Sequence, residues 1–342
     1  ATSYMVIVQI GGVLATVAVC IAAWNLSRPL SSTGKGAPII GLRMAVFYLV
    51  VTAAFGITYA FNRGAFWFDM LDNRVLAHAH LGLLGWLGLA YVAVAEKLWP
   101  MFLLAHRPHV RAGERAVVTL SIGVPILALA MLWPSKVLTC VGAVVVLAGL
   151  GFHLSSLASV IKHRRRGLEL LHGFVLTSAA CLVIAAITGG IGVIASVGSF
   201  SADVSYRFIP AEVLALILWL ALAVIGHAHK IVPFISWNRL RDMGIMTGRD
   251  GRPLLFAHLV NQDLARATFA LAALAAASGI AGTLGAAPLL VRVSGIALGA
   301  AGAIAIANLV SGPLLMIKWH NQQTSAENSA AVDKDTAHVS NQ

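Results

Sequence analysis

The sequence predicts an all-α fold, a polytopic membrane helix bundle of about nine transmembrane helices. The first observation behind this prediction is composition: 59% of the 342 residues are hydrophobic and 11% are charged, and the mean hydropathy is +0.85. The second is that apolar residues form runs of roughly 20, the length that crosses a bilayer. Backbone groups in lipid must pair within their own segment, so each run is predicted to be a helix. The alternation typical of outer-membrane strands is absent from the sequence.

The predicted spans form one transmembrane domain, residues 1–318. A polar tail without periodicity, residues 319–342, follows this domain and is expected to be disordered. The longest loop, about residues 236–263, contains Gly-Arg-Asp-Gly-Arg-Pro, which is typical of turns. The spans are expected at residues 5–25, 41–61, 76–98, 116–134, 137–159, 169–197, 209–235, 264–285 and 288–317.

Lysine and arginine alternate between the two sets of connecting segments. One set holds 19 of the 24 basic residues: Arg28, Lys35, Arg43, Lys97, Arg107, Arg111, Arg115, Lys162, Arg164, Arg165, Arg166, Lys230, Arg239, Arg241, Arg249, Arg252, Arg266, Lys318 and Lys334. The other set holds 5: Arg63, Arg74, Lys136, Arg207 and Arg292. Because cytoplasmic loops carry the excess of basic residues, the N-terminus is predicted outside and the C-terminus in the cytoplasm. A bacterial-type cytoplasmic (inner) membrane suits this multi-pass arrangement.

Charge and cysteine usage exclude several other classes. The net charge of +11 is accounted for by these loops, so we expect no nucleic-acid partner. Cys20, Cys140 and Cys181 each lie alone in an apolar run, which indicates small buried side chains and neither disulfides nor a thiolate metal site. The first run follows Ala-Thr-Ser-Tyr, without a basic residue, so we expect a membrane helix and not a cleaved signal peptide.

Histidines within the predicted spans are the candidate functional residues, because ionisable side chains inside a bilayer are rare. Six of the 12 histidines are in this position or at a span's cytoplasmic end: His78, His80, His153, His172, His227 and His229. The other six are expected to be solvated surface residues: His106, His109, His163, His258, His320 and His338.

The first histidine pair lies in Ala-His78-Ala-His80-Leu-Gly82-Leu-Leu-Gly85-Trp86. Positions i and i+2 of a helix point about 200° apart, so the two rings are predicted to serve different centres, or one centre and one polar partner. Gly82 and Gly85 would let a flat macrocycle or a neighbouring helix approach closely. Trp86 is compatible with packing on such a ring.

The second pair repeats the spacing in Gly226-His227-Ala-His229. His227, His153 and His172 are predicted in the cytoplasmic halves of their spans, whereas the first pair is predicted near the outer face. Two alternatives follow. The histidines hold two stacked haems at different depths, which would suit electron transfer, or they converge on one site, which would suit gas binding or a compact metal centre.

Haem b, one or two groups, is the cofactor that this histidine-only pattern favours. Imidazole binds zinc, copper and haem iron, but small metal sites usually include a carboxylate or thiolate. Within the spans we expect only two acids, Glu169 and Glu212, both near an end. Neutral imidazoles flanked by glycine and large apolar residues suit haem, because they add no charge to the bilayer.

The segment from His78 to Trp86 resembles the His-x-His-x-Gly-x-x-Gly-Trp helix of haem–copper oxidases, the C-family or cbb type. The segment Gly226 to Phe234 resembles one in small relatives of that catalytic subunit, and NnrS-type haem–copper proteins linked to nitric oxide are a comparable case. In the family, the two histidines of the motif ligate different haems near the outer face. The resemblance therefore implies a small divergent relative in electron transfer or diatomic gas (NO or O2) chemistry.

The copper centre of that family needs a His-His pair and a nearby tyrosine. This sequence has no His-His pair, so it does not support a copper centre in the way that it supports haem. Whether the protein is a haem-dependent oxidoreductase stays open. Expected partners are the lipid bilayer, a quinol or cytochrome electron donor and a small gaseous ligand. Two alternatives stay open: a quinol-linked cytochrome b electron carrier without gas chemistry, and a non-haem copper-handling or transport protein.

Overall fold

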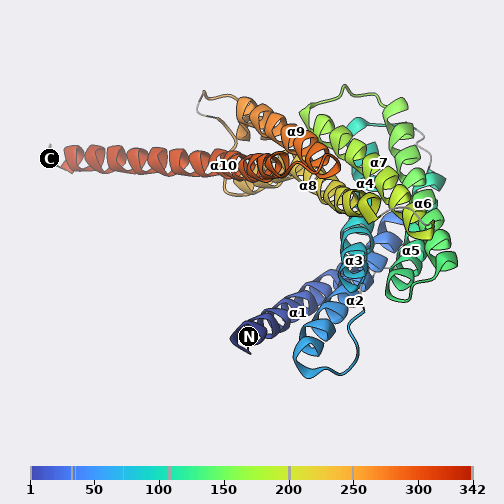
Figure 1. Cartoon of the computed structure of the whole chain (residues 1–342). Coiled ribbons are helices and arrows are strands. Elements are labelled where there is room, and N and C mark those ends of the chain that lie inside the picture. Colours follow the sequence, from blue (N-terminus) through green and yellow to red (C-terminus); the bar gives the residue numbers. More distant parts are fainter. Residues whose placement is uncertain are drawn as a thin grey trace. The chain divides into compact units, whose positions relative to one another are not determined.

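The computed structural model describes residues 2–31, 34, 36–71, 73–106, 110–198, 202–248 and 250–339. Within these residues, nine helices are long and apolar enough to cross a membrane, which confirms the predicted all-α polytopic fold (Figure 1). The predictions made for Lys35, Arg107, His109 and Arg249 lie outside the described residues. The elements are α1 (Thr2–Leu30), α2 (Ala37–Ala65), α3 (Arg74–His80), η1 (Leu81–Gly88), α4 (Leu89–Leu103), α5 (Val110–Leu132), α6 (Lys136–Lys162), α7 (Leu170–Val197), α8 (Ala202–Asp242), η2 (Phe256–Leu259), α9 (Gln262–Leu284) and α10 (Pro288–Val339).

The chain divides into two compact units, which we call the first and second units. The first comprises Ala1–Leu168, Ala179–Leu220 and Thr283–Ala286. The second comprises Glu169–Ser178, Ala221–Gly282 and Ala287–Gln342.

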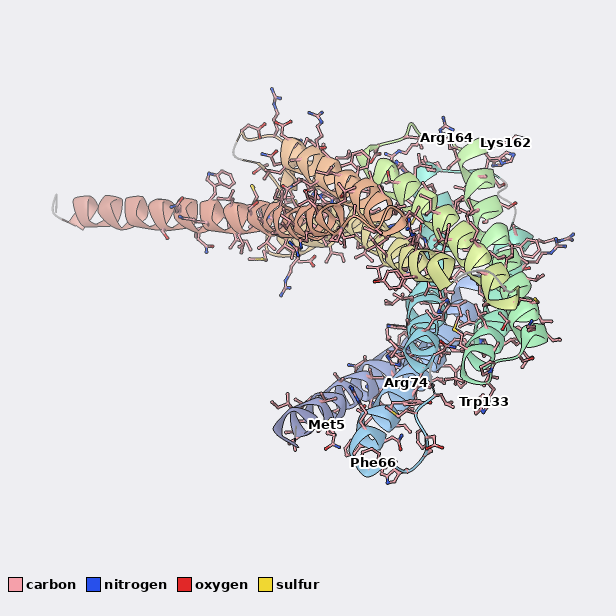
Figure 2. All side chains as sticks on the ribbon, viewed as in Figure 1. Met5, Phe66, Arg74, Trp133, Lys162 and Arg164 are labelled. Carbon is pink, nitrogen blue, oxygen red and sulfur yellow. The ribbon has the colours of Figure 1, made fainter. Side chains whose placement is uncertain are left out.

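The ends of the helices in the first unit follow the alternation that the charge count predicts. Figure 2 shows Arg74 and Trp133 towards one end of this unit and Lys162 and Arg164 towards the other. Arg74 belongs to the sparse set of basic residues, whereas Lys162 and Arg164 belong to the rich set. The orientation itself, with the N-terminus outside, stays a prediction from this charge distribution.

The third span is one continuous helix with an unusual central segment. α3 and α4 are joined by η1, an eight-residue π-helix with the sequence Leu-Gly-Leu-Leu-Gly-Trp-Leu-Gly. π-Helical segments are rare and frequently mark functional sites. This one begins directly after His80, so the histidine lies at the junction of the two helical geometries.

In the first unit, a tyrosine hydroxyl bonds a helix carbonyl that a proline leaves without its usual donor. Pro125 lies inside α5 and has no N–H to donate to the carbonyl of Ser121, four residues earlier. The Tyr48 hydroxyl of α2 donates to this same carbonyl, with an O···O distance of 2.5 Å. Since Tyr48 is 3% exposed, the bond lies inside the bundle and ties α2 to α5.

The second unit is held together by close backbone contacts and an amide pair. A Cβ built on Gly226 would lie 2.6 Å from the Cβ of Phe174, so only glycine lets α8 approach α7 there. Asn261 donates its N–H to Asn308 Oδ1, and Asn308 Nδ2 donates to the Asn261 carbonyl, each over 2.9 Å. This reciprocal pair joins the start of α9 to α10.

α10 extends beyond the last apolar run into the polar C-terminal segment, as far as Val339. After Pro313 this segment contains neither proline nor glycine, the two residues that most disfavour a helix. The disorder expected for residues 319–342 stays a prediction.

Candidate functional site

A cavity of about 540 Å³ lies within the first unit, among residues of α3, α5, α6, α7 and α8. Its volume is in the range of about 300–1,000 Å³ that is typical of cofactor and small-molecule sites. Most of its wall is leucine, alanine, valine and glycine. The polar residues in its wall are Asn73, His80, Ser135, Lys136, Thr139, Ser196 and Glu212.

His80 is oriented within the cavity wall by its own helix. Its Nδ1 lies 2.9 Å from the carbonyl oxygen of Leu76, one turn earlier. A carbonyl only accepts, so Nδ1 carries the hydrogen and the second ring nitrogen, Nε2, carries the lone pair of the neutral ring. A ligand histidine usually has this arrangement, because the Nδ1 hydrogen bond sets the tautomer and the ring orientation.

Glu212 of α8 is the partner of this nitrogen in the structure. His80 Nε2 lies 3.3 Å from Glu212 Oε1. Two proton arrangements satisfy the contact: a protonated imidazole donates to the carboxylate, or a carboxylic acid donates to the neutral ring. In both arrangements, the two ring nitrogens of His80, which is 1% exposed, keep their hydrogen bonds.

A glycine on α7 makes room for that carboxylate. A Cβ built on Gly189 would lie 2.4 Å from Glu212 Oε1. Gly190 and Gly192, on the same helix, line the cavity with it. Sequence reasoning assigned neither these glycines nor Glu212 to the site, although the Gly-Gly-x-Gly spacing within a span was the signal that could have indicated it.

His78 points to a different neighbour, as its i, i+2 spacing from His80 predicts. Its ring lies 5.7 Å from the ring of Phe55 in α2, and its Cε1 lies 3.0 Å from a Cβ built on Gly56. Within the described part of the chain, its Nδ1 has no hydrogen-bond partner. The two histidines therefore cannot share one centre.

The glycines of the motif serve helix packing. A Cβ on Gly85 would lie 3.0 Å from the Tyr48 ring, and one on Gly82 would lie 3.5 Å from Thr52. Side chains of α2 thus cover both positions, which is the neighbouring-helix alternative. Trp86 is half-buried and is not among the residues that line the cavity.

His153 of α6 lies deeper in the first unit. Its ring is 5.5 Å from the Tyr91 ring, edge to face. It is fully buried, and neither ring nitrogen has a hydrogen-bond partner among the described residues. Tyr91 follows His80 by eleven residues on one continuous helix, which corresponds to roughly 15 Å at 1.5 Å per residue. His153 and His80 therefore lie at different levels of the unit.

Glu96 is an acid that the sequence analysis overlooked. It lies inside the third predicted span, where Ser156 of α6 donates a hydrogen bond to its Oε2 over 2.9 Å. Gly113 of α5 leaves the space that this carboxylate occupies. The prediction that Glu169 and Glu212 are the only acids of the spans was wrong, because Glu96 lies within the span predicted at residues 76–98.

In the second unit, two histidines repeat the backbone hydrogen bond of His80. Nδ1 of His227 lies 2.7 Å from the Ala223 carbonyl, and Nδ1 of His229 lies 2.8 Å from the Ile225 carbonyl. In both neutral rings the lone pair is therefore on Nε2. The ring of His229 stacks on Phe174, with the ring centres 5.5 Å apart and the planes 18° apart.

His172 has the opposite tautomer. The backbone N–H of Glu169 donates to its Nδ1 over 2.7 Å, so the hydrogen of the neutral ring is on Nε2. A nitrogen that carries a hydrogen cannot ligate a metal, so this geometry disfavours His172 as an Nε2 ligand. The neighbouring Gly173 faces Phe269, whose ring carbon would lie 3.4 Å from a Cβ there.

Within the described residues, no three His, Cys, Asp or Glu side chains are grouped so that they could hold a metal ion. Comparison with known proteins finds no match to a family model, a curated protein or a solved structure. The argument for function therefore rests on the residues of this chain.

Proposed function

We propose that the chain is a haem b-binding integral membrane protein of the haem–copper oxidase type, which handles electrons or a diatomic gas. The cavity of the first unit would hold the haem, and His80 would be the side chain that ligates it. The observation that carries this proposal is the orientation of His80, whose Nδ1–H is held by the Leu76 carbonyl while the ring lines the cavity.

The cavity residues fit the group in three respects. The wall is mainly apolar and includes three glycines, as a flat macrocycle needs. The volume is in the cofactor range. The donor set is a neutral imidazole, the axial ligand of many b-type haems. When bound, haem supplies one-electron and gas chemistry.

The protein's own groups orient the ligand and keep water out. The Leu76 carbonyl fixes the tautomer of His80, and Glu212 holds Nε2 by a hydrogen bond that the ring would exchange for iron. Leucine and valine side chains of α5 and α6 exclude water from the same space. His153 is the candidate ligand for a second haem deeper in this unit, and His227 and His229 are the candidates in the second unit.

The experiment is a haem count and a reduced-minus-oxidised spectrum of the purified full chain, expressed with haem supplied. We expect a Soret band in the native protein and at least a tenfold lower haem content at the cavity site in His80→Ala. The matched control is His163→Ala, because His163 makes the same Nδ1 contact to a carbonyl, that of Ser159 at 2.8 Å, but is exposed at a helix end. Absence of any Soret band, or equal spectra for the two variants, would overturn the proposal.

The His80–Glu212 contact favours a second candidate, a non-haem carrier in which the pair binds a copper ion or another small solute in the cavity. Membrane-embedded His and Glu pairs commonly mark substrate or ion pathways. Protein that retains copper and lacks haem would favour this candidate over the first.

A further inference from the structure

Four of the seven polar residues in the cavity wall lie at one end of the helices that line it. Asn73 immediately precedes α3, Ser135 and Lys136 lie at the start of α6, and Ser196 lies in the last turn of α7. Because successive spans run in opposite directions, these starts and this end belong to the same side of the unit. Figure 2 shows Arg74 and Trp133 towards the same end of the first unit, which agrees with this.

The other end of the cavity is apolar. Along α6 the lining residues run from Lys136 through Val146 to Leu150. These fourteen steps span roughly 21 Å at 1.5 Å per residue. Leu84 of η1 and Leu216 of α8 line the cavity as well. The cavity is therefore polarised along its length, with hydroxyl, amide and ammonium groups at one end and hydrocarbon at the other.

Of the two charged side chains among the described residues that line the cavity, one is paired within the wall and the other is not. Lys136 is the one lysine or arginine among the described residues that line the cavity, and Glu212 is the one carboxylate. Glu212 is engaged with His80. Lys136 takes part in no ion pair among the described residues. A ligand that brings a carboxylate to this end would therefore meet an ammonium group with no other counter-charge.

We propose that Lys136 anchors the carboxylate end of an amphipathic ring ligand, with Asn73 and Ser135 beside it. The inference rests on the proposed haem function, and for haem b the carboxylates are its two propionates. The ring then lies in the apolar part of the cavity, where His80 reaches it, and the polarity of the wall admits one orientation only. Lys136 is thus a positioning residue for the cofactor.

The test compares two probes on the haem-depleted full chain in detergent: haem b and its dimethyl ester, in which both carboxylates are esterified and uncharged. Lys136 is exposed, so solvent weakens its attraction for a carboxylate, and the native chain is expected to bind haem b up to about fivefold more tightly than the ester. In Lys136→Gln this preference is expected to fall below about twofold, with the affinity for the ester unchanged. Lys136→Arg keeps the charge and is expected to keep the preference.

The matched control is Lys162→Gln, because Lys162 is the last residue of the same helix and does not line the cavity. Equal binding of the two probes by the native chain, or an unchanged preference in Lys136→Gln, would overturn the anchor while leaving haem binding in place. If neither probe binds the native chain, the proposed function fails, and the anchor fails with it. If Lys136→Gln does not fold, Lys136→Met serves instead, since it keeps the length of the side chain without the charge.

Discussion

The two His-Ala-His pairs of this chain have the same spacing and different surroundings. In the first pair, His80 lines a cavity and contacts Glu212. In the second pair, His229 stacks on Phe174, and neither histidine is among the residues that line that cavity. The backbone hydrogen bond through Nδ1 is common to His80, His227 and His229. The carbonyl one turn earlier therefore sets the tautomer of these three rings, and the neighbouring helices decide what the other nitrogen can bind.

The glycines beside the pairs differ in the same way. Gly189 makes room for the carboxylate of Glu212, which contacts His80, whereas Gly226 precedes the second pair and makes room for Phe174. Small residues at membrane helix interfaces permit close approach. In the region of the first pair, the group beside the glycine is a carboxylate, and in the region of the second pair it is an aromatic ring. The first region is therefore suited to binding and the second to helix packing.

The largest expected effect separates the two pairs by their haem content. His80→Ala is expected to lose its haem at least tenfold, because the cavity then lacks a ligand nitrogen. His227→Ala is expected to retain that haem, since His227 does not line the cavity. The haem-to-protein ratio and the Soret spectrum of each purified variant measure this. Loss in His227→Ala with retention in His80→Ala would reverse the assignment of the two regions.

The next effect tests the second region as a packing site. Phe174 is fully buried, so Phe174→Ala should leave a void and lower the free energy of unfolding by about 3–5 kcal/mol. Leu176→Ala is the control on the same helix, because Leu176 is 42% exposed. Thermal unfolding in detergent measures both. A cost for Phe174→Ala no greater than that for Leu176→Ala would show that the stacked ring does not support the unit.

A smaller effect concerns the hydrogen bond that ties α2 to α5 in the first unit. Tyr48→Phe keeps the ring against Gly85 and removes the hydroxyl that serves the Ser121 carbonyl, so we expect a loss of about 1–3 kcal/mol. In a Pro125→Ala background, the backbone N–H of residue 125 can donate to that carbonyl, and the same substitution should cost less. A double-mutant cycle measures the coupling. An unchanged cost in the Pro125→Ala background would mean that the hydroxyl is not replacing the missing donor.

The smallest effect compares glycines of the two regions. A Cβ on Gly82 would make an ordinary contact of 3.5 Å with Thr52, so Gly82→Ala should change the free energy of unfolding by less than about 1 kcal/mol. A Cβ on Gly226 would lie 2.6 Å from Phe174, so Gly226→Ala should destabilise by about 1–3 kcal/mol. The melting temperatures of the two variants, measured in the same detergent, test this difference. Equal shifts for the two variants would remove this distinction between the regions.

Much of the fold could be predicted because the bilayer imposes it. The nine predicted spans correspond to the nine membrane-long helices among the described residues, and every one of these helices except α7 extends beyond its apolar run at one end or both. The π-helical segment after His80 was not predicted, since its leucine and glycine composition suits an ordinary helix equally well. The extension of α10 to Val339 was not predicted either.

The site could be predicted in part. A histidine within an apolar span is visible in the sequence, and so is the 200° separation of His78 from His80. Glu212 as the partner of His80 was not predictable, because 131 residues lie between them and no local rule brings α3 to α8. Glu96 was visible in the sequence and was overlooked.

The sequence by itself determined the membrane helices and the alternation of charge, because these depend on local composition and on the lipid. The tertiary structure alone decided which histidine lines a cavity, which one stacks on a ring and where the acid of α8 lies. These depend on the approach of helices far apart in the chain. Such an approach is set by small residues such as Gly189 and Gly226, whose neighbours the sequence does not name.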